Sequence, residues 1–484
     1  MTTTSNLHST INLPLSTINL PLPTINLPKE NIPKFKKNTD CVNIDKIQYI
    51  FHYNELKDKI FHPYKIFFKP EFVKNFENTC HHMFKKVGFG IFVFVLEGKI
   101  HTYQVFANTT ELKPGSNKIT KKHLSNYKKK TQKQKFPILK DKKKWGFSNC
   151  MVHLKENWWE KFYTIVYFDM LQKCLEGSSV TTCFFINLND FPVLYKKKCK
   201  QHISNEETCS NNDKEDNIYI PVLSGTTTKD YYDKCLVYAD SWEIASQTVF
   251  YNENKCQNRY NEDEFKKINT KWNTKKNEFV FRGKNNSCYP NDFIKNDRLK
   301  VLKVLKRMYD DHEIPEKIEL NVGFTKFSNK SVFADNQLTS SDSNYIVKRL
   351  KEWSHIEQMS MIEQSNCKYI LNIDGYVTAW RLSCELSYNS CILLLYSKYY
   401  SWFHDKLVHM KNVYKIDVES DELKLKDELS KALHIFANND NIGKKIARGA
   451  RKLYDEIMNV AYIKKYMISL LLQKEFDLLI PIRQ

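Results

Sequence analysis

The stretch KYILNIDGYVTAWRL, residues 368–382, gives the strongest indication of the fold class. An apolar run ends at Asp374 and Gly375, and a helical pattern follows. A strand that ends in a glycine turn before a helix is typical of open α/β sheets. We expect the helix to begin near Thr378, so that its N-terminus, with Arg381 one turn in, can hold a phosphate group. Asp374 would then cap the helix or bind a ribose hydroxyl, and an ordinary strand–turn–helix is the alternative.

A second strand end has the same form. The stretch FVFRGKNNS, residues 279–287, runs from an apolar strand through Gly283 into a polar loop, and NDRL, residues 296–299, follows. We expect a helix to begin near Asp297. Its exposed N–H groups form an anion site, and Arg298 can add bidentate donors for a diphosphate.

A third strand end carries a carboxylate. In FINLNDFP, residues 185–192, Asp190 follows an apolar run and Pro192 stops the strand. The carboxyl ends of strands are where open α/β sheets bind ligands, and a carboxylate there can act as a general base. The alternative is that Asp190 only caps the following turn.

The remaining pattern alternates strands with helices. Residues 87–106 predict a β-hairpin, and residues 156–174 predict an amphipathic helix. Further strands are expected at residues 183–188, 219–223, 279–281, 318–322, 369–373, 391–395 and 413–416, and closing helices at 441–458 and 462–476. This alternation predicts an α/β fold with largely parallel sheets.

The composition leaves two interpretations of the charge open. The chain has 484 residues, enough for two or three domains, and a net charge of +20. Such a charge suits an anionic ligand or surface, including nucleic acid, or it reflects lysine-rich codon usage in an AT-rich genome. We see no arginine pattern on helices that would read base edges, so no specific nucleic-acid partner is expected. The 13 cysteines contain no CxxC pair, which favours reduced thiols.

The chain start predicts an extended tail. Residues 10–29 repeat the heptad TINLPLS with proline at a fixed place, which forbids a continuous helix. The first residues lack the basic and apolar regions of a secretory signal, and no apolar run is long enough to span a bilayer. A cytoplasmic location is therefore expected. The lysine-rich stretch 128–144 is either a solvated loop or a patch for an anionic partner.

In this order, the segments resemble glycosyltransferase family 90, the protein O-glucosyltransferase family, which includes Rumi-like and capsule-associated xylosyltransferase-like members. The family carries an Asp-Tyr/Phe-Pro segment, then a strand ending Phe-Arg-Gly, then a Lys-Tyr…Gly…Arg segment. Here these are Asp190-Phe191-Pro192, Phe281-Arg282-Gly283, and Lys368-Tyr369 through Arg381. Segments 221–224, 296–299 and 438–449 also fit, so the resemblance covers roughly residues 180–460.

The resemblance implies a GT-B-type α/β fold, with two Rossmann-like domains facing across a cleft. The implied organisation is a disordered, low-complexity tail at 1–40, an acceptor-side domain at 41–270, a nucleotide-sugar-binding domain at 271–460, and a crossover helix at 461–484 that returns to the first domain.

The resemblance also assigns residue roles. Asp190 corresponds to the catalytic base. The implied donor-binding residues are the two arginines Arg298 and Arg381, the phosphate-facing turn of Gly375, Thr378, Ala379 and Trp380, and the loop beneath the donor with Arg282, Gly283 and Ser287. The implied reaction is an inverting, metal-independent transfer of glucose or xylose from a UDP-sugar to a hydroxyl of a protein or glycan acceptor, without a bound cofactor. No Asp-x-Asp stands at a strand end, in agreement with the absence of a metal.

Two departures from the family pattern concern single positions. Lys284 stands where animal members have serine, and Asn389 replaces a usual glycine. Two alternative functions stay open: a glycosyltransferase-like protein that has lost catalysis, and a basic binding or virion-associated protein. A cytosolic protein of a large virus, or of a parasite with an AT-rich genome, is consistent with the composition and with the lack of a signal.

Overall fold

The structure, a computed structural model, describes residues 66–83, 87, 89–107, 168–187, 189–196, 219–237, 266–287, 295–326, 356–418 and 421–481. The expected tail, the lysine-rich stretch and the first half of the helix expected at 156–174 lie outside these residues.

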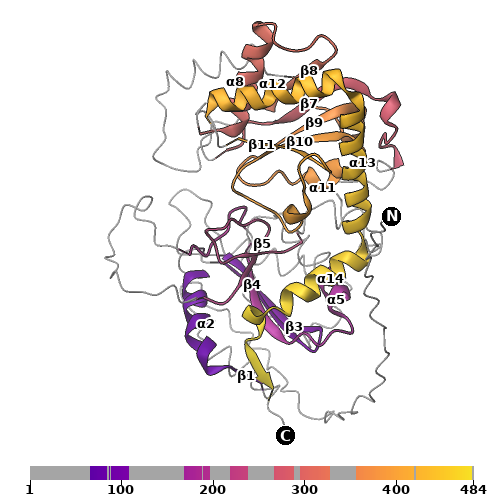
Figure 1. Cartoon of the computed structure of the whole chain (residues 1–484). Helices are drawn as coiled ribbons and strands as arrows, with labels where there is room; N and C mark the ends of the chain where they lie inside the picture. Colours follow the sequence, from indigo (N-terminus) through magenta and orange to yellow (C-terminus); the bar gives the residue numbers. More distant parts are fainter. Residues whose placement is uncertain are drawn as a thin grey trace, which may run out of the picture. The chain divides into compact units, whose positions relative to one another are not determined.

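The second half of the chain builds a five-stranded sheet in which every pairing is parallel (Figure 1). In spatial order the strands are β11 (Tyr414–Asp417), β10 (Cys391–Tyr396), β9 (Cys367–Ile373), β7 (Lys276–Lys284) and β8 (Glu319–Lys326). The chain adds β8 on one side of β7 and then crosses to add β9 on the other side. The point where the order reverses therefore lies between β7 and β9, and ligands of open α/β sheets bind at such a point.

Helices cover both faces of this sheet. Phe279 and Phe281 of β7 point into a core formed with α8 (Asp297–Asp310) and α12 (Glu422–Asn438), which lie side by side in Figure 1. Val280, between the two phenylalanines, belongs to the core on the opposite face, with α11 (Leu382–Leu386) and α13 (Asp440–Ile457). This alternation is the period of two that a pleated strand imposes on its side chains.

The first half of the chain builds a mixed sheet, in which antiparallel strands of the predicted hairpin region join the expected parallel ones. The spatial order is β3 (Lys99–Ala107), β2 (Phe89–Leu96), β4 (Thr182–Ile186), β5 (Val222–Ser224) and β6 (Lys234–Cys235). The pairs β3–β2 and β2–β4 are antiparallel, and only β4–β5 and β5–β6 are parallel. The predicted hairpin is confirmed, and its tight turn accounts for the antiparallel pairing of β2 with β3.

The mixed sheet also has a core on each face. Phe76 of α2 (Pro70–His82) packs with Phe92 and Phe185 on one face. On the other face, α5 (Phe168–Leu175) packs against α14 (Val460–Leu471), which continues from α13 near the chain end. After α14, β12 (Leu479–Pro481) pairs antiparallel with β1 (Ile66–Phe68), so the last strand meets the first one described.

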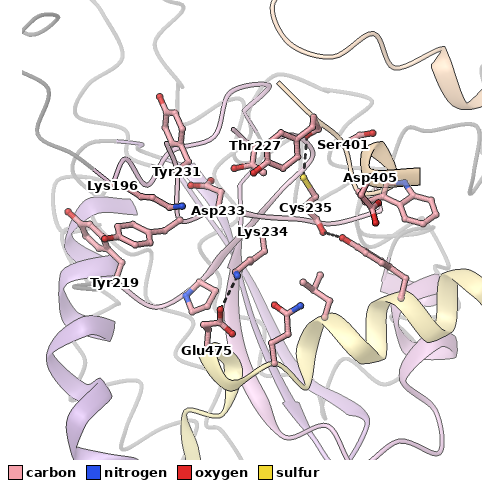
Figure 2. Close-up of a pocket in the computed structure, with 17 residues that line it drawn as sticks. Lys196, Tyr219, Thr227, Tyr231, Asp233, Lys234, Cys235, Ser401, Asp405 and Glu475 are labelled. Atoms are coloured by element: carbon pink, nitrogen blue, oxygen red, sulfur yellow. Dashed lines mark hydrogen bonds and ion pairs between the residues drawn. The ribbon is translucent and has the colours of Figure 1, made fainter. Parts of the chain in front are cut away.

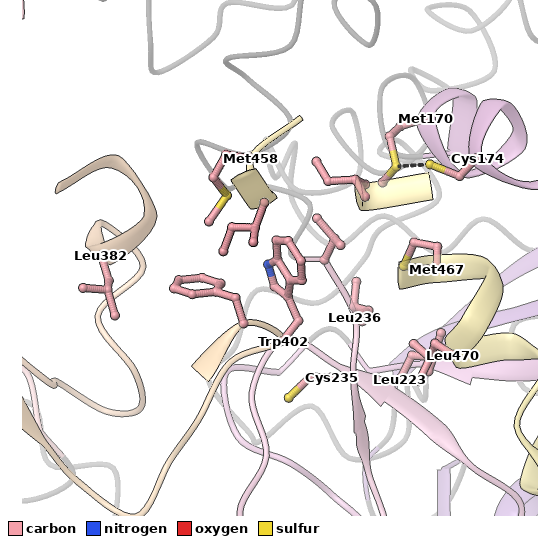
Figure 3. Close-up of a cluster of buried hydrophobic side chains, with 14 of the residues drawn as sticks. Met170, Cys174, Leu223, Cys235, Leu236, Leu382, Trp402, Met458, Met467 and Leu470 are labelled. Atoms are coloured by element: carbon pink, nitrogen blue, oxygen red, sulfur yellow. Dashed lines mark hydrogen bonds between the residues drawn. The ribbon is translucent and has the colours of Figure 1, made fainter. Parts of the chain in front are cut away.

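One hydrophobic cluster joins residues from both halves of the described chain. Figure 3 draws members of this cluster from both halves, with Leu236 and Trp402 in the middle of the view and Leu223 next to Leu470 of α14. The Tyr466 hydroxyl also donates a 2.6 Å hydrogen bond to the carbonyl of Cys235. The closing helix therefore contacts the first sheet through both apolar and polar groups.

The remaining elements are short. They are η7 (Trp272–Thr274), α10 (Met361–Gln364), η8 (His404–Lys406) and η9 (Lys474–Phe476). The helix expected at 462–476 divides into α14 and η9. The seven described cysteines are all free and buried. Among the described residues, no helix has both the length and the apolar character that crossing a bilayer requires.

Candidate functional site

Two of the three strand ends singled out in the sequence meet at the switch point of the parallel sheet. β7 and β9 are hydrogen-bonded neighbours, with Phe279 opposite Tyr369. Their carboxyl ends, at Lys284 and Ile373, therefore lie at the same edge of the sheet. This is the edge at which a doubly wound sheet offers a ligand site.

Arg298 ties these two strand ends together. It stands in the first turn of α8, which begins at Asp297 as the sequence predicts. Its guanidinium donates to the carbonyls of Ile373 (3.0 and 3.2 Å) and Lys284 (2.8 Å), and to that of Asp374 (3.1 Å). Burial, followed by the nearby charge of Arg381, lowers the pKa of Arg298 to about 9. The group therefore places a buried positive charge at the switch point.

Arg381 brings a second guanidinium to the same place. Its Nη1 donates to the carbonyl of Arg282, and its Nε lies 2.8 Å from Oε1 of Glu385 in an ion pair. Both guanidinium carbons approach the Phe281 ring, at 5.0 Å for Arg381 and 5.8 Å for Arg298. Within the described residues, Nη2 of Arg381 is buried and makes no hydrogen bond. A buried donor without a partner is costly, so this atom fits a ligand that supplies an acceptor.

The turn after β9 is held by Asp374. One carboxylate oxygen accepts from the backbone N–H of Ala379 at 2.9 Å, and the other accepts from the hydroxyl of Ser397 at 2.9 Å and its N–H at 3.2 Å. Burial raises the pKa of this carboxyl. Both oxygens thus accept hydrogen bonds within the chain, so Asp374 shapes the turn, but it does not cap α11, whose N-cap residue is Arg381.

The helix after this turn begins later than predicted. We expected it near Thr378, with Arg381 one turn in, but α11 begins at Leu382 and Arg381 is its N-cap residue. The physical reason is the hydrogen bond from Ala379 to Asp374, because it holds the residues before Leu382 in a loop.

The backbone of the turn approaches Arg298 closely at Gly375. A Cβ added to Gly375 would stand 3.1 Å from Nη2 of Arg298 and 3.4 Å from the carbonyl oxygen of Asn286. Thr378 is buried, and within the described part of the chain its hydroxyl has no hydrogen-bond partner. Ala379 is buried beside it, and Trp380 is half-buried. The turn therefore combines a close backbone approach with an unused hydroxyl.

The three residues expected in the loop beneath the donor lie at or just after the end of β7, and none of them adds a cation to the arginine pair. The side chain of Arg282 turns away from the arginine pair: its Nη1 and Nη2 donate to Asn321 of β8 at 2.6 Å each, and its Nε donates to the carbonyl of Glu357 at 2.9 Å. Gly283 lies under the Phe281 ring, where a Cβ would stand 2.8 Å from Cζ. Ser287 is buried in the loop after β7. The structure thus brings the carbonyl of Arg282, not its guanidinium, to the site.

Asp190 lies in the loop after β4. Burial raises the pKa of its carboxyl. In the residues that the structure describes, no hydrogen bond or ion pair reaches this carboxylate, while its carbonyl oxygen accepts from the hydroxyl of Thr226 at 2.9 Å. The adjacent ring of Phe191 contacts the rings of Tyr376 and Tyr399, with centroids 6.3 and 6.2 Å apart. The Asp190 loop therefore touches the residue that follows Gly375.

A buried polar network, missed in the sequence, holds this loop. Asn187 donates to the carbonyl of Phe191 (2.7 Å) and to the Ser224 hydroxyl (3.0 Å), which in turn donates to Asp233 (2.5 Å). Asp233 also accepts from the N–H groups of Val193 (2.9 Å) and Leu194 (2.7 Å). Burial raises the pKa of Asp233 to about 6. The three side chains come from distant positions and form no local motif, so no signal in the sequence marks them.

Within the described ranges, no group of three or more His, Cys, Asp or Glu side chains is placed to hold a metal ion. The groups gathered at the switch point are instead cations, a hydroxyl and a close backbone turn. Such a set suits a phosphate-bearing ligand.

Comparisons with known proteins agree with the resemblance seen in the sequence. The model of the family described as "Glycosyl transferase family 90" matches residues 112–479. The chain is 25% identical over 452 residues to "Uncharacterized protein 179R" of Invertebrate iridescent virus 6, which covers 82% of this chain and 37% of that protein. It is 26% identical over 355 residues to "Uncharacterized protein 035R" of Invertebrate iridescent virus 3, which covers 68% and 30%. The chain thus spans about a third of the length of these viral relatives.

Two solved structures share weak likeness with this chain. One is Anabaena Alr3699/HepE in complex with UDP and glucose, at a TM-score of 0.29 and 11% identity over 52% of this chain and 63% of that one. The other is the S. aureus MnaA–UDP structure, at a TM-score of 0.24 and 11% identity over 47% and 53%. Likeness at this level does not specify a ligand for this chain.

Proposed function

This chain belongs to glycosyl transferase family 90, and on that premise we propose that it transfers a sugar from a UDP-sugar to an acceptor hydroxyl. The proposed donor sugar is glucose or xylose, the acceptor is a protein or glycan, and the reaction inverts the anomeric centre without a metal. The observation that carries the proposal is the pairing of Arg298 and Arg381 around Phe281 at the switch point of the parallel sheet.

The donor's diphosphate fits this arginine pair. Arg298 supplies positive charge but spends its N–H groups on backbone carbonyls, whereas Arg381 keeps one buried N–H donor free of intramolecular partners among the described residues. The hydroxyl of Thr378 and the close backbone at Gly375 complete the proposed phosphate cradle, with Ala379 and Trp380 in the same turn. Charge that develops on the leaving diphosphate would be stabilised by these preorganised groups.

The acceptor would be activated by Asp190. Its carboxylate takes the proton of the attacking hydroxyl as the oxygen bonds to the anomeric carbon and the bond from that carbon to the diphosphate breaks. Two features support this role: the carboxylate has no competing partner in the described residues, and burial raises its pKa. A base with a raised pKa drives proton transfer better while it stays ionised near neutral pH.

Arg282, Gly283 and Ser287 are proposed to support the donor from below. Arg282 fixes the end of β7 against β8, and its carbonyl accepts from Arg381. The GT-B arrangement and the domain limits at residues 41, 271 and 461 belong to the same proposal. The ring contact between Phe191 and Tyr376 supports it, because it links the loop of the proposed base to the proposed donor turn.

We also propose a cytoplasmic location. The free thiols of the seven described cysteines support it, since disulfides are typical of oxidising compartments.

The proposed function is tested by UDP release. The full chain is incubated with UDP-glucose, UDP-xylose and UDP-galactose in the presence of peptide and oligosaccharide acceptors, with and without EDTA. We expect one donor to give acceptor-dependent UDP release that EDTA leaves unchanged. Failure of all three donors contradicts the proposed donor class, and inhibition by EDTA contradicts the metal-independent mechanism.

A further inference from the structure

A hollow lies beside the edge strand of the first sheet. It has a volume of about 510 Å³ and lies against β6, with walls from the segment around β5, from residues 400–405 and from the α14–η9 region (Figure 2). Cavities of roughly 300–1,000 Å³ are typical of small-molecule sites. We call it the β6 cavity.

The walls of the β6 cavity are rich in aromatic rings that carry a polar group. The aromatic lining residues are Tyr219, Tyr231, Tyr232, Tyr400, Trp402 and Tyr466, and none is phenylalanine. Such rings offer a flat apolar face together with a polar edge. A pyranose has the matching chemistry, because its C–H groups form an apolar face and its hydroxyls form a polar rim.

The charged groups of the β6 cavity already have ion-pair or hydrogen-bond partners within the chain. Lys234 lies 3.0 Å from Glu475 in an ion pair, which Figure 2 shows at one side of the cavity. Lys196 donates to the carbonyl of Lys229 at 2.8 Å, and Asp405 pairs with Lys406 at 2.9 Å. The remaining charged lining group, Asp233, accepts two backbone N–H bonds and the Ser224 hydroxyl. A neutral ligand fits this balance better than an anion or a cation does.

Polar groups without such partners also face the β6 cavity. Among the described residues, the hydroxyls of Tyr231, Tyr400 and Ser401 and the side-chain amide of Gln473 have no intramolecular hydrogen-bond partner. These groups can both donate and accept hydrogen bonds, as the hydroxyls of a neutral sugar require.

Two residues that line the β6 cavity are next in sequence to residues that contact the loop of the proposed base. Thr227 lines the cavity, and its neighbour Thr226 donates to the carbonyl of Asp190 at 2.9 Å. Tyr400 lines the cavity, and its neighbour Tyr399 packs on Phe191. We propose that the β6 cavity binds a neutral saccharide portion of the acceptor, apart from the hydroxyl that reacts. This inference rests on the proposed transferase function only for identifying the saccharide as part of the acceptor.

Saccharide binding by the full chain tests the proposal. The probes are neutral trisaccharides of glucose, xylose, mannose and N-acetylglucosamine, and saturation-transfer NMR and calorimetry measure their binding. We expect at least one to bind the wild type, and Tyr231→Ala and Tyr400→Ala to weaken binding by roughly tenfold, because each removes a ring face. Tyr309→Ala is the matched control, since Tyr309 is 61% exposed on α8 and does not line the cavity. Its binding should equal that of the wild type.

The outcomes separate this inference from the proposed function. Gln473→Ala, at an exposed position, tests the cavity without loss of a packed ring and should also weaken binding. The proposal is overturned if none of the four trisaccharides binds, if binding is the same in the wild type and all cavity variants, or if a heparin hexasaccharide binds in their place. A parallel measurement of UDP-induced stabilisation reports on the donor site alone. If UDP stabilises the chain but no saccharide binds, only the proposal for the β6 cavity is refuted. If a saccharide binds but UDP does not stabilise the chain, only the proposed donor site is refuted.

Discussion

The rings of Phe191 and Tyr376 pack edge to face, with 6.3 Å between their centroids. Phe191 follows Asp190, and Tyr376 follows Gly375, so one aromatic contact joins the loop of the proposed base to the proposed phosphate turn. In a single-displacement transfer, the base and the leaving group act on opposite sides of one anomeric carbon, so their separation must be fixed. This contact is a structural element that can fix it.

Asp190→Asn should abolish most transfer and leave donor binding intact. Loss of a general base typically lowers the rate by roughly 10²–10⁴-fold, whereas the amide still fills the same space. The rate of acceptor-dependent UDP release measures the effect. Because burial raises the pKa of Asp190, the wild-type kcat/KM should fall as pH drops through a value above that of a free carboxyl. Asp230→Asn, on the exposed neighbouring loop, is the matched control. An Asp190→Asn variant with wild-type turnover would remove this residue from the mechanism.

Asp233→Asn should change the pH dependence of stability. Burial raises the folded-state pKa of Asp233 from 3.8 to about 6, so the folded state holds this proton more tightly than the unfolded state does. The stabilisation from the protonated group is complete below the unfolded value and is lost as pH rises through about 6, a decline of about 3 kcal/mol. Asparagine has no such titration, and it also loses one acceptor for the N–H groups of Val193 and Leu194.

Urea unfolding of both proteins from pH 4 to pH 7 measures this difference. The wild type should lose stability relative to Asp233→Asn as pH rises across this window. A stability difference between the two proteins that stays constant with pH would show that Asp233 does not titrate there.

Gly375→Ala should weaken UDP binding. The new Cβ would stand 3.1 Å from Nη2 and 3.2 Å from Cζ of Arg298, and three backbone carbonyls hold that guanidinium in place. The crowding should cost about 1–3 kcal/mol of stability and displace the arginine. Isothermal titration with UDP, at a temperature where the variant is folded, should show at least roughly tenfold weaker binding. Unchanged UDP affinity would mean that the ligand does not approach this turn.

The strand ends were predictable because their signals are local. The apolar runs at 369–373 and 279–281 each end two residues before a glycine, and parallel strands bring such ends to one edge, although β7 continues through Gly283 to Lys284. The order of strands that places β7 beside β9 is not local, because it depends on a crossover. The resemblance to the family supplied the pairing of Arg298 with Arg381, which spacing alone does not give.

Two features of the site that the sequence does not give have physical causes at particular residues. The helix expected near Thr378 starts at Leu382 because the side chain of Asp374 captures the N–H of Ala379. Arg282 points away from the arginine pair because β7 extends to Lys284, and neighbours on a strand face opposite sides. Tertiary contacts decide both features, and local propensity does not contain them.

Asp233 was overlooked for a related reason. Its partner Ser224 lies 9 positions before it in the chain, and Asn187, which donates to Ser224, lies another 37 positions earlier. A sequence shows an aspartate there but not the two backbone N–H groups that converge on it.

The most direct test of the donor site is UDP-induced stabilisation of the wild type and of Arg381→Ala. With UDP at 100 times its dissociation constant, the unfolding free energy of the wild type should rise by about 2.7 kcal/mol. Arg448→Ala, at an exposed position on α13, should respond as the wild type does. Arg381→Ala should lose the response, because the buried donor that UDP would use is gone. If UDP stabilises Arg381→Ala as much as the wild type, or stabilises neither protein, the arginine pair is not a UDP site and the proposed transferase mechanism is wrong.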